Sequence, residues 1–272
     1  MRPPDEADPL TERIAVAGDG YLPGTAWNGW HVLALLGGGF LGSIIGAVVA
    51  NASGRGFASD PVSVFGFVFP GQVAGTLAVA WYLSRDRGTG NWVRDFGFRL
   101  RPRHAWGLLA GVGLQVGALL VTGITITVLG SDSTPDQEVV EIAEDAAGGA
   151  VVLALVATVL LAPLVEELIY RGVLLSRLRR SIGRHQAVFL SGGLFALVHL
   201  VDPGTLLLQP ALFLIGVALG YAALRSGDLS LPLFVHAGVN LTGFLLAQFA
   251  DDLQRWADDL EESVEAVFRL FG

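Results

Sequence analysis

The chain has 272 residues, of which 52% are hydrophobic and 15% are charged, and its mean hydropathy is +0.57. This composition is too apolar for an ordinary soluble domain and is typical of a polytopic membrane protein. The absence of cysteine excludes disulfides, a thiolate nucleophile and a Cys-ligated metal. The net charge of -8 disfavours a nucleic-acid partner.

Seven apolar segments follow one another along the chain, and about 20 residues of helix are enough to cross the hydrocarbon core. The pattern therefore predicts an all-α protein, a polytopic transmembrane helix bundle of about seven spans that is integral to the cell membrane and contacts membrane lipid. The fifth segment is the shortest, and we expect part of it to be buried in protein. The segments are 30–50, 62–83, 105–130, 149–175, 187–200, 205–224 and 229–249.

Polarity divides the chain into four regions. A polar N-terminal segment covers 1–29, three transmembrane helices cover 30–130, and a second group of spans covers 149–250. In 251–272, apolar residues recur mostly at three- and four-residue intervals and acidic residues fill the other face. This last pattern predicts an amphipathic helix that packs on the bundle, lies on the bilayer or binds a partner.

Arginine is concentrated in two of the predicted turns. The turn after the second segment carries six arginines and the turn after the fourth carries four, whereas the connection over 131–147 is acidic and has no basic residue. Because basic residues are enriched in cytoplasmic loops, we expect both arginine-rich turns and the N-terminus to be cytoplasmic. The arginines are Arg85, Arg87, Arg94, Arg99, Arg101 and Arg103, and Arg177, Arg179, Arg180 and Arg184.

Three ionisable residues, Glu166, Glu167 and Arg171, lie inside the fourth apolar segment. Each charge at membrane depth costs at least about 2.5 kcal/mol, so each calls for a partner or a chemical role. Glu167 and Arg171 have the i, i+4 spacing of a supporting ion pair, and we expect Arg171 to snorkel towards the cytoplasmic boundary. Glu166 projects about 100° away around the helix, so its partners must come from other segments.

Polar residues in two later segments are candidates for those partners. His199 lies in the fifth segment, and His236 and Asn240 lie on one helix face in the seventh. Counted inward from the cytoplasmic ends, these residues and Glu166 lie at depths of roughly 10 to 18 Å, so one pocket can hold all four. Pro163 removes one helix hydrogen bond near Glu166, and it either admits water there or is an ordinary tolerated proline.

Such a pocket has a direct use in peptide hydrolysis. Glu166 can take a proton from water, and His199 can orient that water or share the proton. His236 and Asn240 can donate hydrogen bonds to the oxygen that becomes negative when water adds to a peptide carbonyl.

The three motifs, in this order on membrane segments, resemble those of the CPBP family of intramembrane glutamic endopeptidases. That family includes the type II CAAX prenyl endopeptidases and relatives linked to bacteriocin self-immunity. The motifs are Glu166-Glu167-x-x-x-Arg171, Phe195-x-x-x-His199 and His236-x-x-x-Asn240.

The resemblance implies that 149–250 is an intramembrane protease core. Glu166 and His199 would be catalytic, His236 and Asn240 would form the oxyanion site, and Glu167 and Arg171 would support the pocket. Water would attack directly, without a cofactor or a covalent acyl-enzyme. The substrate would be a membrane-associated protein or peptide, CAAX-like and prenylated in some relatives, that enters from the cytoplasmic side or laterally between helices.

Three alternatives remain open. Glu166, His199 and His236 could hold zinc with a water, although no His-Glu-x-x-His pair is present. Buried Glu and His residues also mark proton-coupled transporters, but the chain shows no repeated half. A non-catalytic bacteriocin-immunity or scaffold protein would use the pocket to bind without cutting.

Overall fold

The protein is described here by a computed structural model that covers residues 25–56, 60–131 and 138–271. The polar N-terminal segment predicted over 1–29 lies almost entirely outside these residues. In the described ranges every regular element is a helix, and six helical stretches are long and apolar enough to span a membrane. The protein is thus an all-α integral membrane protein, as predicted. The six stretches are Gly29–Ala52, Pro61–Asp86, Pro102–Leu129, Gly149–Arg179, Pro203–Ser226 and Ser230–Gln248.

The fifth predicted segment forms α11 (Arg184–Val198), which is 15 residues long. At 1.5 Å per residue it extends about 22 Å, less than the roughly 30 Å of the hydrocarbon core. The chain then turns through two 3₁₀ helices, η5 (His199–Val201) and η6 (Pro203–Leu208), into α12 (Gln209–Ser226). Asp202 caps η6 by accepting a hydrogen bond from the Gly204 amide at 2.9 Å. The early end of α11 leaves His199 inside the protein at a helix terminus.

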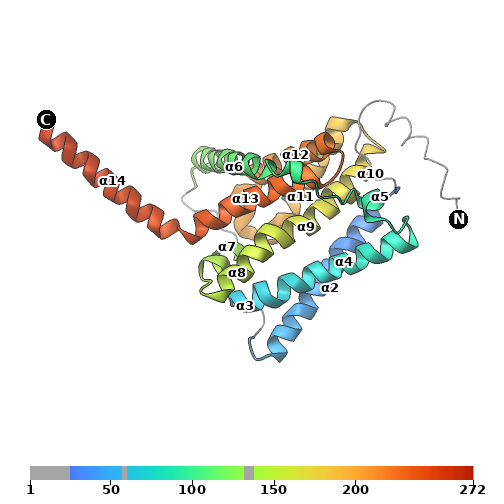
Figure 1. Cartoon of the computed structure of the whole chain (residues 1–272). Helices are drawn as coiled ribbons and strands as arrows, with labels where there is room; N and C mark the ends of the chain where they lie inside the picture. Colours follow the sequence, from blue (N-terminus) through green and yellow to red (C-terminus); the bar gives the residue numbers. More distant parts are fainter. Residues whose placement is uncertain (1–24, 57–59, 132–137, 272) are drawn as a thin grey trace.

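Helix α9 (Ala162–Glu167), which carries both glutamates, lies in the middle of the bundle (Figure 1). On one side it contacts α4 (Phe69–Asp86), which pairs with α2 (Gly29–Ala52). On the other side it contacts α13 (Ser230–Gln248), which packs on α6 (Gly107–Leu129) and α12. Residues from α9 can therefore meet residues from the last spans of the chain.

The pairing of α2 with α4 depends on glycines at four-residue spacing, Gly38, Gly42 and Gly46 on α2 and Gly71 and Gly75 on α4. Cβ atoms placed on Gly42 and Gly75 would lie 2.1 Å from the carbonyl oxygens of Gly71 and Gly38. The two backbones are thus in direct contact, as in other small-xxx-small pairs of membrane helices.

Gly42→Ala is expected to destabilise the protein by about 1–3 kcal/mol, because the new methyl group must push two backbones apart. Gly37→Ala is the matched control, since no atom lies within 4 Å of a Cβ at Gly37. The free energies of unfolding of both variants are measured in mixed micelles with increasing SDS. Equal stabilities of the two variants would contradict this packing.

Two buried carboxylates hold the arginine-rich end of the bundle. Asp95 accepts hydrogen bonds from the hydroxyls of Thr25, Ser84 and Thr89. Asp228 pairs with Arg101 at 2.6 Å. Because these residues come from separate connections, the turns at this end are fixed to one another.

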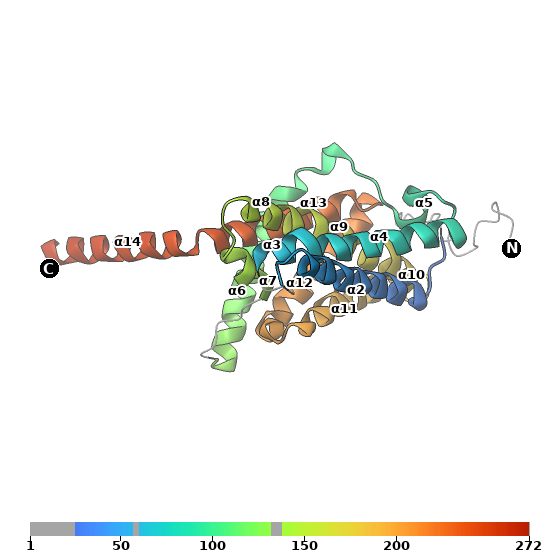
Figure 2. The same cartoon turned by 90° about the horizontal axis from the view of Figure 1, so that it is seen from below.

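The predicted C-terminal amphipathic helix is present as α14 (Ala250–Phe271). It extends away from the bundle in both views (Figures 1 and 2). Among its described side chains, Trp256, Leu260 and Val264 form an exposed apolar stripe at four-residue spacing. What covers this stripe stays a prediction, with the bilayer, the bundle and a partner as alternatives.

Candidate active site

The helix that carries the glutamates changes register on both sides of them. A π-helical turn, η3 (Ala157–Leu161), precedes α9, and a second one, η4 (Leu168–Leu175), follows it. In η3 the Ala162 amide donates to the Ala157 carbonyl, five residues back. The next donor in this register would be residue 163, but Pro163 has no N–H. The Thr158 carbonyl is thereby left for another donor, and the Asn240 side-chain amide fills that place at 2.8 Å.

Asn240→Leu is expected to destabilise the protein by about 1–3 kcal/mol, because the Thr158 carbonyl then loses its donor. In a Pro163→Ala background the cost should be smaller, since the new backbone N–H can bond the same carbonyl. A double-mutant cycle by unfolding in mixed micelles measures the coupling. An equal cost of Asn240→Leu in both backgrounds would show that the proline and the amide are not linked.

The predicted ion pair of Glu167 with Arg171 is confirmed, with Nη1 of Arg171 2.9 Å from Oε1 of Glu167. The expected snorkelling of Arg171 is wrong, because both side chains are 0% exposed. Nη2 of Arg171 donates to the Gly216 carbonyl at 2.8 Å, and the guanidinium lies 4.8 Å from the centre of the Phe195 ring. Arg171 therefore takes its further partners from α11 and α12, inside the protein.

Glu167 has a second partner that the sequence spacing does not indicate. Nδ1 of His236 donates to the same Oε1 of Glu167 at 2.8 Å. A carboxylate only accepts, so the Nδ1 hydrogen points to Glu167, and Nε2 is the nitrogen on the other side of the ring. Glu167 thus fixes the orientation of His236 as well as holding Arg171.

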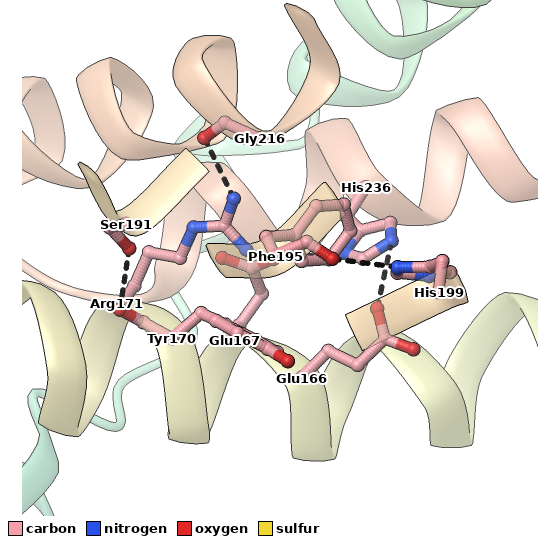
Figure 3. A network of polar contacts seen from close by, with 9 residues as sticks. All are labelled: Glu166, Glu167, Tyr170, Arg171, Ser191, Phe195, His199, Gly216 and His236. Atoms are coloured by element: carbon pink, nitrogen blue, oxygen red, sulfur yellow. Dashed lines mark hydrogen bonds and ion pairs between the residues drawn. The ribbon is translucent and has the colours of Figure 1, made fainter. Parts of the chain in front are cut away.

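Glu166 finds its partner on another segment, as expected. Its Oε2 lies 3.6 Å from Nε2 of His236, and its side chain is 26% exposed while that of Glu167 is fully buried. Figure 3 shows the Glu166 carboxylate directed at the His236 ring. This separation exceeds that of a direct hydrogen bond. The two adjacent glutamates therefore differ in environment: Glu167 is enclosed and paired, and Glu166 faces an open space.

His199 is held by its own helix. Its Nδ1 donates to the Phe195 carbonyl at 2.7 Å, so Nε2 carries the lone pair when the ring is neutral (Figure 3). The Phe195 ring lies 4.8 Å from the His199 ring and 5.8 Å from the His236 ring, between centroids. Phe195 therefore positions both imidazoles.

Glu166, His199, His236 and Asn240 all line one cavity of about 540 Å³. The prediction that one pocket holds the four residues is confirmed. Most of the other wall residues are apolar, and they include Leu212, Ile215, Val239 and Phe244. A carboxylate and two imidazoles in a mostly apolar cavity form an arrangement suited to proton transfer.

Two groups in this network have no signal in the sequence. The carbonyls of Thr158 and Gly216 act as acceptors, and any residue carries a carbonyl. Gly216 is used because α11 and α12 cross closely there, where a Cβ would lie 2.8 Å from the Cα of Gly192. Across the described residues, no group of three or more His, Cys, Asp and Glu side chains is arranged to hold a metal ion. The zinc alternative stays a prediction.

The chain is thus a polytopic helical membrane protein whose bundle encloses a cavity lined by a carboxylate and two imidazoles. A family model described as "Type II CAAX prenyl endopeptidase Rce1-like" matches residues 148–242, a range that includes every motif residue from Glu166 to Asn240. An "Uncharacterized 24.3 kDa protein" of Escherichia coli is 30% identical over 152 residues, which cover 54% of this chain and 70% of that protein. No solved structure matches. The chain belongs to the Rce1-like family of type II CAAX prenyl endopeptidases, and the family resemblance of its motifs is thereby confirmed.

Proposed function

We propose that this protein is an intramembrane glutamic endopeptidase that hydrolyses a peptide bond of a membrane-associated protein or peptide, with Glu166 as the base that activates water. The observation that carries this proposal is the contrast between the two glutamates. Glu167 is neutralised by Arg171 and engaged by His236, whereas Glu166 lies 3.6 Å from His236 and opens into the cavity. Glu166 is therefore the carboxylate that can accept a proton.

In this mechanism water attacks the peptide bond directly, and no covalent acyl-enzyme intermediate forms. Glu166 takes a proton from water as the water oxygen attacks the peptide carbonyl, and it then gives that proton to the departing amine. Nε2 of His199, the lone-pair nitrogen of the neutral ring, can accept a hydrogen bond from the same water. The products are a carboxylic acid and an amine, and Glu166 returns to its ionised form.

The oxyanion of the tetrahedral intermediate needs donors, and His236 and Asn240 are the candidates. His236 donates through Nε2 when the ring is doubly protonated, with Nδ1 still held by Glu167. The Asn240 amide uses one hydrogen on the Thr158 carbonyl and has a second for the substrate. One such donor is typically worth about 3 kcal/mol of transition-state stabilisation.

The test is cleavage of a lipid-inserted peptide by the purified full-length protein in proteoliposomes, with and without a strong chelator. Cleavage that resists the chelator is expected, because water is activated by a carboxylate. Chelator-sensitive cleavage that zinc restores would favour the alternative in which Glu166, His199 and His236 bind zinc. Absence of cleavage of every prenylated and unprenylated peptide offered would favour the non-catalytic immunity or scaffold alternative.

A further inference from the structure

The cavity extends from Glu166 in one direction only. On the helix that carries Glu166, the lining residues Thr158 and Ala162 recur at i-8 and i-4, towards the Gly149 end. On α13 the lining runs from His236 to Ala247, about 16 Å along the helix axis towards its C-terminal end. These two helix ends lie at the same end of the bundle (Figure 1).

At that end the cavity is bordered by α7 (Glu138–Glu144) and by the junction of α13 with α14. The backbone amide of Glu138 donates to Asp202 at 3.0 Å, and the Gln248 side chain donates to the Ala143 carbonyl at 2.5 Å. Helix α7 is thus hydrogen-bonded to the turn between η5 and η6 and to the C-terminal end of α13. We call this border the mouth, and it comprises Val140, Ala143, Glu144, Leu246, Ala247 and Ala250.

Exposure distinguishes the mouth from the inner end of the cavity. Glu144, Leu246 and Ala250 are exposed, whereas Phe195 and His236 at the inner end are buried. The cavity therefore meets its surroundings at the mouth. Leu119 of α6 is another exposed lining residue, so one wall of the cavity borders the lipid.

The arginine-rich turns lie at the opposite end of the bundle. The cavity's lining, as far as the structure describes the chain, includes no residue of the turn from 85 to 103 or of the turn from 177 to 184. Helix α7 carries Glu138, Glu141 and Glu144 and no basic residue. Since arginine marks the cytoplasmic side, the mouth faces the other side of the membrane.

We infer that the substrate reaches Glu166 from the extracytoplasmic half of the membrane, as an extended apolar peptide segment that passes through the mouth. This inference rests on the proposed function for its chemistry and on the cavity for its route. It departs from the cytoplasmic-side entry that the family resemblance implied, lateral entry between helices being the other route implied there. The apolar walls, with Leu212, Ile215, Val239 and Phe244, favour apolar side chains next to the scissile bond.

The absence of native cysteine allows a direct test with single-cysteine variants of the full chain. Val140→Cys lies in the mouth, and Glu141→Cys, its neighbour on α7, is exposed but does not line the cavity. Ser181→Cys reports on an arginine-rich turn. A bulky membrane-impermeant maleimide is applied to spheroplasts, and cleavage by the purified labelled proteins is compared with that of each variant before labelling.

Labelling of Val140→Cys and Glu141→Cys in intact spheroplasts is expected, and that of Ser181→Cys only after permeabilisation. Modification should abolish cleavage by Val140→Cys and spare cleavage by Glu141→Cys. Labelling of Ser181→Cys from outside, or full activity of modified Val140→Cys, would overturn the route. If wild type cleaves no peptide, the proposed function fails, while the labelling pattern still reports which membrane face holds the mouth.

Discussion

Glu166→Gln is expected to reduce the rate of peptide cleavage by about 10²–10⁴-fold or more, because an amide cannot accept the proton of the attacking water. The fold should be retained, since Glu166 is partly exposed to the cavity and its Oε2 lies 3.6 Å from Nε2 of His236, beyond the range of a direct hydrogen bond. The measurement is the single-turnover rate of cleavage of a membrane-inserted peptide by purified protein, with unfolding in mixed micelles as the stability readout.

Glu141→Gln is the matched control for this prediction. It makes the same change of charge on an exposed carboxylate of α7 that does not line the cavity. Cleavage by Glu141→Gln should therefore equal that of wild type. If Glu166→Gln cleaves at the wild-type rate while folded, the assignment of Glu166 as the base is wrong. If it cleaves slowly only because it unfolds, the stability readout will show the loss.

Arg171→Met is expected to destabilise the protein by about 3–5 kcal/mol, because it leaves the Glu167 charge buried without its guanidinium partner. Glu167 and Arg171 are both fully buried, and Arg171 also bonds the Gly216 carbonyl on α12. A Glu167→Gln/Arg171→Met double variant should lose less than the sum of the two single variants. The glutamine keeps an oxygen acceptor for Nδ1 of His236 and removes the unpaired charge.

Arg87→Met is the matched control, because it breaks an exposed salt bridge, whereas Arg171→Met breaks a buried one. Arg87 and Asp86 pair at 2.8 Å with side chains that are 69% and 43% exposed. An exposed pair contributes about 1 kcal/mol or less, so this variant should be close to wild type in stability. Comparable losses from Arg171→Met and Arg87→Met, measured by unfolding in mixed micelles, would show that the buried network does not support the site.

The two glutamates explain why adjacent carboxylates can have different roles. Glu167 is engaged by Arg171 one turn further along the same helix and by the imidazole of His236 on α13, whereas Glu166 faces the cavity. The His236 ring lies between them, bonded to Glu167 through Nδ1 and facing Glu166 through Nε2. In the proposed mechanism Glu167 and Arg171 are positioning residues, and a change in either should affect Glu166 through the orientation of His236.

The class of fold, the helical positions of the polar residues and the pairing of Glu167 with Arg171 all follow from the sequence. These features are local: apolar segment length sets the spans, and i, i+4 spacing brings two side chains together on one helix. The sequence also indicated that Glu166 needs a partner elsewhere, because the charge lies at membrane depth next to a pair that is already formed.

The partner that each polar group takes could not be read from the sequence. The choice of His236 by Glu167, of the Gly216 carbonyl by Arg171 and of the Thr158 carbonyl by Asn240 depends on helices that are distant in sequence. The same is true of the direction of the cavity, which follows from where α7 and the end of α13 meet. A periodic pattern reports which face of a helix a residue occupies, but the neighbour of that face is set by packing between helices, and backbone acceptors carry no residue signature at all.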